Sequence, residues 1–284
     1  MTGEPPVSGT IIIAAHNEEA VIGRTLDALA DVRSVGDLRV IVVCNGCTDN
    51  TAQVAGARSG VIVVHLDVAS KIAALREGDR HAAAGPRIYL DADIVLTDRA
   101  ARDVVATLSR GALAARPRHR FDTSRSSAIV TSWYRIRERL PSISSALWGA
   151  GCYALSVDGR ARFDEFPDVV SDDLFIDSLF TADDVVILDT DPVVVTAPRR
   201  LKGLISILRR SYRTQSEVVD GEGSAAGLSQ GQRGQVADIR ALLRREPSRI
   251  GDVVVYVAVA AYARMRARRA RGPQAWERDA SSRE

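Results

Sequence analysis

Cysteine is scarce in this sequence, and what is missing excludes several classes of protein. The three cysteines (Cys44, Cys47 and Cys152) are too few and too scattered for a disulfide framework, so we expect a reducing, cytoplasmic setting. No apolar run reaches the roughly 20 residues that a membrane-spanning helix needs. The N-terminal stretch MTGEPPVSG is polar and lacks the basic-then-apolar order of a signal peptide, so we expect none.

Two nucleotide-binding signatures are also missing. No GxGxxG follows the first apolar run, which argues against a dinucleotide fold, and the absence of GxxxxGK[ST] argues against a P-loop ATPase. The net charge of +2 does not indicate a nucleic-acid partner, and we expect none. With 46% hydrophobic and 26% charged residues, the 284-residue chain can build a sizeable core in one large domain or two small ones.

Strand and helix patterns alternate along the first third of the chain. Continuous, largely β-branched runs predict buried strands, and apolar residues at helical spacing predict helices between them. The expected strands are 10–15, 39–43, 61–64 and 88–90, and the expected helices are 17–30, 49–57 and 70–84. This βαβαβαβ pattern predicts a parallel sheet with helices on both faces, joined by right-handed crossovers.

The rest of the chain is less regular. We expect helices over 98–109, 125–140, 172–182, 201–219 and 236–265, a glycine-interrupted strand pair over 147–157 and a strand over 185–189. The stretch 220–235, DGEGSAAGLSQGQRGQ, is rich in Gly, Ser and Gln, which predicts a flexible loop or linker.

Polar residues follow each of the first four strands. Asn17 and Glu18 follow the first, Asp49 belongs to the group after the second, and the third leads through Asp67 to Lys71. Capping explains any one of these groups, since Asn17 and Asp49 suit helix starts. Ligands of parallel α/β sheets bind outside the carboxyl ends of the strands, so the coincidence of four such ends favours a ligand site.

The fourth strand ends in Asp91-Ala92-Asp93, with apolar residues on both sides. Two carboxylates at a strand end offer oxygen ligands to a hard divalent cation such as Mg²⁺ or Mn²⁺, which proteins usually hold together with substrate phosphates. A solvated turn is the alternative. Lys71 could add positive charge near the same phosphates or be a surface lysine at a helix start. Cys44-x-x-Cys47 could form a redox pair, but both cysteines lie inside the segment VIVVCNGCTDNTAQVA, for which a family resemblance gives a better explanation.

Four segments in order resemble glycosyltransferase family 2, the inverting GT-A transferases: IIIAAHNEEAVIGRTLDAL, VIVVCNGCTDNTAQVA, SKIAALREG and YLDADIVL. The resemblance covers residues 10 to about 215. It implies a GT-A fold, in which a Rossmann-like, mostly parallel central sheet carries helices on both faces, followed here by a C-terminal helical extension.

The resemblance assigns roles to residues of the nucleotide half. Glu18 and Asp49 match residues near the nucleoside, Lys71 matches a lysine near the diphosphate, and Asp91 with Asp93 matches the metal-binding pair. There are two departures. Ala14 stands in the nucleotide-binding loop where the family often has proline, and Asn45-Gly46-Cys47 replaces the commoner Asp-Gly-Ser, which removes a carboxylate.

The acceptor half is similar in the same way. The segment WGAGCYALS (148–156) resembles the glycine-containing segment below the sugar and the acceptor. The segment VVSDDLFID resembles a Glu-Asp motif whose second carboxylate is the catalytic base, which corresponds to Asp173. An acidic first helical turn is the alternative. In LRRSYRTQ, Arg209, Arg210 and Arg213 loosely match a basic segment near the leaving diphosphate, and a solvated helix face is the alternative.

The sequence therefore predicts a metal-dependent inverting glycosyltransferase of cell-envelope or polysaccharide biosynthesis. The expected partners are a nucleoside-diphosphate sugar and an acceptor hydroxyl, with lipid-linked molecules and polysaccharide precursors as candidate acceptors. Two alternatives stay open: a nucleotidylyltransferase and a non-catalytic carbohydrate-binding protein on a transferase fold. The expected divisions are a flexible tail (1–9), a catalytic domain (10–219, with halves 10–97 and 98–219), a linker (220–235) and a C-terminal helix with a basic tail (236–284).

An apolar run near the C-terminus, VVVYVAVAAYA (253–263), is followed at once by Arg264, Arg266, Arg268, Arg269 and Arg271. The run is too short to span a bilayer. It predicts either a helix docked on the catalytic domain or an interfacial helix that places the protein peripherally on the inner face of an anionic membrane.

Overall fold

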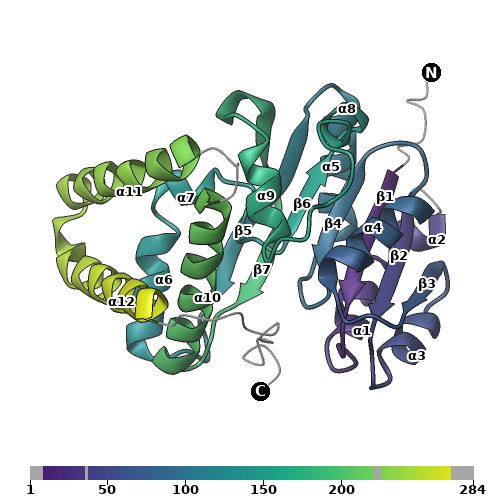
Figure 1. Ribbon diagram of the computed structural model, residues 1–284, viewed down its shortest axis with the longest axis horizontal. Helices are drawn as coiled ribbons and strands as arrows, with labels where there is room; N and C mark the ends of the chain where they lie inside the picture. Colours follow the sequence, from purple (N-terminus) through teal and green to yellow (C-terminus); the bar gives the residue numbers. More distant parts are fainter. Residues whose placement is uncertain (1–8, 36–37, 221–224, 270–284) are drawn as a thin grey trace. The chain divides into compact units, whose positions relative to one another are not determined.

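The computed structural model describes residues 9–35, 38–220 and 225–269, and within these it does not describe the side chains of 213–233 and 268–269 (Figure 1). The tail predicted over 1–9, apart from Gly9, and the basic tail after 269 lie outside the described residues. None of the described helices is long and apolar enough to cross a membrane.

The four predicted strands of the first third are confirmed. They are β1 (Gly9–Ala15), β2 (Leu38–Asn45), β3 (Val61–Leu66) and β4 (Arg87–Asp91). β1 pairs in parallel with β2 and β4, and β2 pairs in parallel with β3. Ile11, Ile12 and Ile13 are all fully buried, so both faces of β1 are covered, as the continuous apolar run predicts.

The helices between these strands are α1 (Ile22–Asp27), α2 (Ala30–Val35), α3 (Thr51–Gly56) and α4 (Lys71–His81), and α5 (Asp98–Ser109) follows β4. The single helix predicted over 17–30 is wrong, because α1 begins only at Ile22 and is separated from α2. Asn17 does not cap it: its backbone is in the left-handed region (φ 54°), and its side-chain oxygen accepts hydrogen bonds from the Thr48 and Asp49 N–H groups.

Three further strands complete a seven-stranded sheet of order β3-β2-β1-β4-β6-β5-β7. They are β5 (Ala114–Asp122), β6 (Cys152–Leu155) and β7 (Val185–Thr196). β6 runs antiparallel to both β4 and β5. The strand pair predicted over 147–157 is therefore one strand, and no pattern in the sequence predicts β5. Short helices α8 (Val157–Arg160), α9 (Asp172–Ser178) and η1 (Ala182–Asp184) lie between β6 and β7.

The chain forms two compact units, which do not follow the boundaries expected from the sequence. The first unit comprises Met1–His119 and Leu147–Val194, and the second comprises Arg120–Ala146 and Val195–Glu284. The first unit contains β1–β4, β6 and the helices that cover them. The second unit contains α6 (Ala128–Arg137), α7 (Pro141–Ser144), α10 (Leu201–Asp220), α11 (Ala225–Arg245) and α12 (Ile250–Arg269).

Two expectations for the C-terminal part are corrected. The loop predicted over 220–235 is helical from Ala225, because α11 continues through several glycines that each cost only about 1 kcal/mol in a helix. The helix predicted over 236–265 is interrupted by η2 (Pro247–Arg249), since proline lacks the N–H that an α-helix needs. α12 then begins at Ile250.

Candidate active site

The carboxyl ends of the parallel strands meet at one edge of the sheet, as predicted. Ala14 of β1 is in register with Asp91 of β4, and Ala15 is in register with Cys44 of β2. Asn45, at the end of β2, pairs with Leu66 of β3. The polar residues that follow these strands therefore lie along a single rim of the first unit.

The loops after β1 and β2 are fastened to each other by reciprocal hydrogen bonds. The Glu19 N–H donates to Asp49 Oδ2 over 3.2 Å, and the Asn50 N–H donates to Glu19 Oε2 over 3.0 Å. The Glu18 N–H donates to Thr51 Oγ1 over 2.6 Å. Asp49 Oδ1 also accepts the Thr51 N–H over 3.0 Å at the start of α3, but the N-cap residue is Asn50 and its side chain makes no capping hydrogen bond. The nucleotide-binding roles of Ala14, Glu18 and Asp49 stay predictions.

Lys71 joins the end of β4 to the start of α9. Its ammonium lies 2.7 Å from Asp91 Oδ1 and 2.8 Å from Asp172 Oδ1. Burial lowers the pKa of Lys71, but the carboxylates of Asp172, Asp91 and Asp173 outweigh burial and raise that pKa above its ordinary value. Lys71 is therefore a cation held between two carboxylates at this rim, which disfavours the alternative of an unpaired surface lysine. The Ser70 hydroxyl positions it, because Ser70 caps α4 by accepting the Ala73 N–H.

Asp172 is the buried member of the acidic pair. Its side chain is only 4% exposed, and its Oδ2 accepts a hydrogen bond from the Tyr153 hydroxyl over 2.9 Å. The Tyr153 ring stacks on Tyr89 at 5.0 Å between centroids. Buried charges are retained in proteins when they are paired and hydrogen-bonded, and Asp172 has both kinds of partner. Its geometry is that of a group that holds Lys71 rather than one that faces a reactant.

Asp173, the predicted base, is held by hydrogen-bond partners other than those of Asp172. Its Oδ2 accepts the Gly149 N–H over 2.8 Å, and its Oδ1 accepts the Leu174 N–H over 2.9 Å and the Ser171 hydroxyl. Burial, with the neighbouring Asp172 charge, raises the pKa of Asp173 above its ordinary value. A raised pKa makes a carboxylate a better proton acceptor, which suits a general base.

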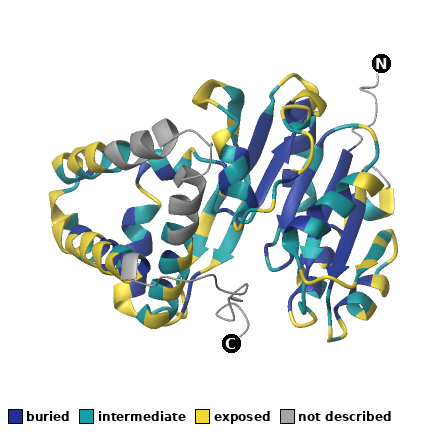
Figure 2. Cartoon of the chain, viewed as in Figure 1, coloured by how far each residue is buried: buried dark blue, intermediate teal, exposed yellow. Residues whose placement is uncertain are grey.

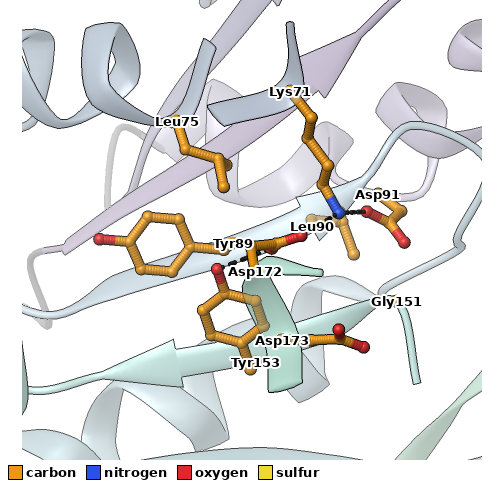
Figure 3. A pocket seen from close by; sticks show the side chains of 9 residues that line it. All are labelled: Lys71, Leu75, Tyr89, Leu90, Asp91, Gly151, Tyr153, Asp172 and Asp173. Atoms are coloured by element: carbon orange, nitrogen blue, oxygen red, sulfur yellow. Dashed lines mark hydrogen bonds and ion pairs between the residues drawn. The ribbon is translucent and has the colours of Figure 1, made fainter. Parts of the chain in front are cut away.

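These residues line one pocket of the first unit (Figure 3). In the figure, Lys71 reaches down from α4 to Asp91, and the carboxylates of Asp172 and Asp173 come from the start of α9. The lining is Lys71, Leu75, Tyr89, Leu90, Asp91, Gly151, Tyr153, Asp172 and Asp173. The structure thus brings together four residues that the sequence singled out separately.

The backbone around the DxD segment is held tightly. The Asp91 N–H donates to the Gly151 carbonyl over 2.8 Å, and the Thr25 hydroxyl donates to the Ala92 carbonyl over 2.8 Å. Arg24 donates to the Asp93 carbonyl over 3.1 Å. Asp93 is only partly buried and is not among the residues that line the pocket.

The donor set fits a cation that is shared with a substrate. Among the described residues, no group of three or more His, Cys, Asp and Glu side chains could hold a metal ion by itself. Mg²⁺ is typically bound by one or two carboxylates plus substrate phosphates, and Asp91 and Asp93 offer two carboxylates at the end of a strand. Because Lys71 already pairs with Asp91, a cation there would share that carboxylate with the ammonium.

Arg209, Arg210 and Arg213 lie on α10 in the second unit. The side chain of Arg213 lies outside the described residues. Arg209 and Arg210 belong to the second unit, whereas the pocket belongs to the first. The proximity of these arginines to the diphosphate stays a prediction.

The sequence did not single out three groups that build this pocket. Tyr153 and Gly149 lie inside the quoted segment WGAGCYALS but carried no assigned role, and Ser171 directly precedes the acidic pair. A tyrosine within a predicted buried strand is one usable signal, because a buried hydroxyl requires a hydrogen-bond partner. That partner is Asp172 at the start of α9, a tertiary contact that the local pattern does not specify.

Comparison with protein-family models gives a match to glycosyl transferase family 2 over residues 10–149. A search of curated protein sequences finds no match. The matched residues include β1–β4 and Asp91, whereas Asp172 and Asp173 lie after them.

Several solved structures are similar in fold. A mannosyltransferase from Pyrobaculum calidifontis, in complex with GDP-Man and Mn²⁺, has a TM-score of 0.60 and 17% identity, covering 93% of this chain and 88% of its own. Glucosyl-3-phosphoglycerate synthase from Mycobacterium tuberculosis, with Mn²⁺ and UDP-glucose, has a TM-score of 0.53 and 20% identity, covering 74% and 77%. S. aureus TarS (1–349) has a TM-score of 0.52 and 13% identity, covering 88% and 80%. At these identities the likeness shows the fold, which is the predicted GT-A architecture.

Proposed function

This chain belongs to glycosyl transferase family 2 through residues 10–149 and is a glycosyltransferase, and we propose that it transfers a sugar from a nucleoside-diphosphate sugar to an acceptor hydroxyl with inversion at the anomeric carbon. The observation that carries the proposal is the convergence of Asp91, Lys71 and Asp173 on one pocket. These groups supply the two things that the reaction needs: charge for the leaving diphosphate and a base for the acceptor.

In the proposed reaction, Asp173 removes the proton of the acceptor hydroxyl as that oxygen attacks the anomeric carbon. Its two backbone donors, Gly149 and Leu174, fix the direction of the carboxylate, and its raised pKa favours acceptance of the proton. A positioned general base contributes about a hundred- to ten-thousand-fold in rate. Asp172 stays outside this step because Lys71 and Tyr153 occupy its two oxygens.

On the opposite side of the sugar, Asp91 and Asp93 would hold a divalent cation, Mg²⁺ or Mn²⁺, together with the donor diphosphate. When bound, such a cation offsets negative charge on the departing nucleoside diphosphate. Lys71 adds a second positive charge in a fixed position, and preorganised charge of this kind stabilises a transition state at little reorganisation cost. Glu18 and Asp49 would contact the nucleoside, with Ala14 beside them, and Arg209 and Arg213 would lie near the diphosphate.

The similar structures guide the choice of donors for a test. The mannosyltransferase structure contains GDP-Man, and the glucosyl-3-phosphoglycerate synthase structure contains UDP-glucose. The scarce, unpaired cysteines support a cytoplasmic setting. We propose an acceptor from cell-envelope or polysaccharide synthesis, either a polysaccharide precursor or a lipid-linked molecule.

The test is thermal unfolding of the protein with each of these sugar nucleotides, with and without Mn²⁺, followed by detection of the released nucleoside diphosphate. A donor that binds only the folded state at about 100 times its Kd adds about 2.7 kcal/mol to the unfolding free energy. We expect stabilisation by one donor that requires Mn²⁺, and turnover that EDTA removes.

Asp93→Ala should abolish turnover and the Mn²⁺-dependent part of donor binding while the fold is kept. Asp158→Ala, which changes an exposed aspartate on α8, is the matched control and should behave as wild type. Full activity of Asp93→Ala, or equal activity in EDTA, would remove the metal role. Release of pyrophosphate from a nucleoside triphosphate and a sugar phosphate would instead identify a nucleotidylyltransferase.

A further inference from the structure

α12 is apolar on two opposite faces, and only one of them is covered by the second unit. The covered face packs against α6 and α10. Its buried residues recur at helical spacing and are Val253, Tyr256, Val259, Ala260, Ala263 and Ala267. The predicted docking of this helix is therefore confirmed for half of its surface.

Specific contacts fix which face is turned inward. The Tyr256 ring stacks on Trp133 of α6 at 5.3 Å between centroids. At the start of the helix, Asp252 accepts a hydrogen bond from the Ser132 hydroxyl over 2.6 Å and pairs with Arg135 at 3.1 Å. Both apolar and polar contacts therefore fix the inward face. A rotation of α12 that buried its other side would break the Tyr256–Trp133 stacking and the hydrogen bond and ion pair of Asp252.

The outward face carries a row of large apolar side chains, which we call the α12 stripe. Its residues and their exposed fractions are Ile250 (62%), Val254 (62%), Val257 (48%), Tyr262 (44%) and Met265 (40%). Figure 2 shows exposed residues recurring along this helix, in alternation with buried ones. Single exposed apolar residues are ordinary on protein surfaces, whereas a contiguous row marks a contact surface.

Positive charge surrounds the stripe at both ends. Arg266 is exposed at its C-terminal end, and Arg244 and Arg245 are exposed at the end of α11, shortly before the stripe begins. The sequence adds Arg268, Arg269 and Arg271, and it has no acidic residue between Asp252 and Glu277. Asp252 itself is already paired with arginines.

We propose that the α12 stripe binds the surface of an anionic lipid bilayer, with its apolar side chains among the upper acyl chains and its arginines among the headgroups. An apolar row flanked by basic residues is the pattern of helices that lie in the plane of a membrane interface, buried by about 5–10 Å. Because the opposite face of α12 is packed on α6 and α10, the helix lies flat and carries the second unit with it.

Charge complementarity selects lipid over a second copy of the chain. Two copies that joined through their stripes would bring arginine-rich ends together, since both ends of the stripe are basic, and like charges in contact are unfavourable. An anionic surface is attractive to every one of these residues, and each basic residue near it strengthens binding about fivefold at best. The binding is therefore reversible and sensitive to salt. This inference stands apart from the proposed catalytic function, since it uses no residue of the pocket.

The test is co-sedimentation of the full-length protein with sucrose-loaded vesicles. We expect binding to vesicles that contain phosphatidylserine, little binding to pure phosphatidylcholine, and loss of binding as the salt concentration rises from roughly 50 to about 500 mM. Absence of binding to anionic vesicles, or equal binding to both kinds, would overturn the proposal.

Two sets of variants locate the surface. Val254→Ser/Val257→Ser should weaken vesicle binding about tenfold, because it removes exposed apolar surface. The matched control Val157→Ser/Val186→Ser changes exposed valines of the first unit (59% and 38% exposed) and should bind as wild type. Arg266→Ser should weaken binding about fivefold, with Arg110→Ser, which changes an exposed arginine after α5, as its control.

Two results would assign the stripe differently. If the protein dimerises without lipid and Val254→Ser/Val257→Ser abolishes the dimer, the stripe is a self-association surface and the proposal is wrong. If the double valine variant loses its fold, Arg266→Ser decides alone: unchanged vesicle binding in that variant contradicts the proposal. Sugar-transfer activity on a soluble acceptor is measured in parallel, and we expect no change in any of these variants.

Discussion

The Tyr153 hydroxyl donates a hydrogen bond over 2.9 Å to Asp172, whose other oxygen lies 2.8 Å from the Lys71 ammonium. Tyr153 of β6 therefore helps to position the Lys71 ammonium, which also pairs with Asp91 at the end of β4. Tyr153 touches none of the proposed reacting atoms. We therefore regard it as a positioning residue, which acts by keeping Asp172 and Lys71 in place.

Tyr153→Phe should reduce both stability and transfer. It removes the donor to a buried carboxylate oxygen, which costs about 1–3 kcal/mol of unfolding free energy. Asp172, which pairs with Lys71, then loses the hydrogen bond that holds it in place, so Lys71 is positioned less well and kcat/KM should fall. The acid limb of the pH profile should not move, because Asp173 sets it. Urea unfolding and initial rates across pH measure these effects.

Tyr89→Phe is the matched control, since Tyr89 stacks on Tyr153 but its hydroxyl serves a different carboxylate. That hydroxyl donates to Asp79, which keeps two arginine partners, Arg87 at 2.7 Å and Arg160 at 2.9 Å, when the tyrosine is lost. We expect a smaller loss of stability and near-normal transfer. Equal effects of the two substitutions on kcat/KM would contradict a specific role for Tyr153.

Gly151→Ala should damage the DxD segment. Gly151 has φ +64°, and a Cβ there would lie 2.5 Å from Ile94 Cγ1 and 3.1 Å from Asp91 Oδ2. We expect a loss of about 1–3 kcal/mol in stability from the strained backbone, with a further loss from the clash, and weaker Mn²⁺-dependent donor binding.

Gly111→Ala separates these two causes. Gly111 also has a positive φ, +110°, but a Cβ there would meet nothing within 4 Å. Its substitution should cost stability through backbone strain alone and leave donor binding unchanged. If donor binding falls equally in both variants, the clash of the new Cβ with Asp91 and Ile94 is not the cause of the weaker binding.

Asp177 makes stability depend on pH. Burial is the main cause that raises the pKa of Asp177 from an ordinary 3.8 to about 6, although the Leu147 N–H donates to it over 2.7 Å. Between these two values the folded state holds more protons than the unfolded state, so the unfolding free energy falls as the pH rises from about 4 to 6.

Asp177→Asn keeps an acceptor for Leu147 but has no proton to lose. The stability of this variant relative to wild type should rise by about 2 kcal/mol between about pH 4 and pH 7, measured by urea unfolding at a series of pH values. Asp158→Asn, on an exposed part of α8, is the control. A difference between Asp177→Asn and wild type that is constant with pH would contradict the assignment.

Much of the pocket could be predicted from the sequence because strand ends carry a strong local signal. Buried strands of a parallel sheet are continuous apolar runs, so Asp91 at the end of one is conspicuous. Parallel strands place their carboxyl ends at one rim, which brings Asp91 and the start of α4 together without further information. The acidic pair after β6 is located by its place in the order of motifs, and the structure puts Asp172 and Asp173 in the same pocket.

What the sequence missed depends on tertiary contacts. β5 was overlooked because its residues, ARPRHRF, alternate basic side chains with others, and such a pattern is not an apolar run. The left-handed backbone of Asn17 and the late start of α1 at Ile22 accompany hydrogen bonds to the loop after β2, which local helix propensity does not include. The role of Tyr153 was missed because its partner lies on α9, outside its own sheet.

The most direct test of the account is sugar transfer by Asp173→Asn, compared with Asp177→Asn and Asp172→Asn, at saturating donor and Mn²⁺. The amide of the first variant would keep the shape of the side chain and an oxygen for one of its two backbone donors, Gly149 or Leu174, but could not accept a proton. We predict a rate reduced by about a hundred- to ten-thousand-fold with donor affinity within about twofold of wild type, and product of inverted anomeric configuration from the active proteins. Wild-type transfer by Asp173→Asn, or a loss of transfer that appears in Asp172→Asn instead, would contradict the assignment of the base.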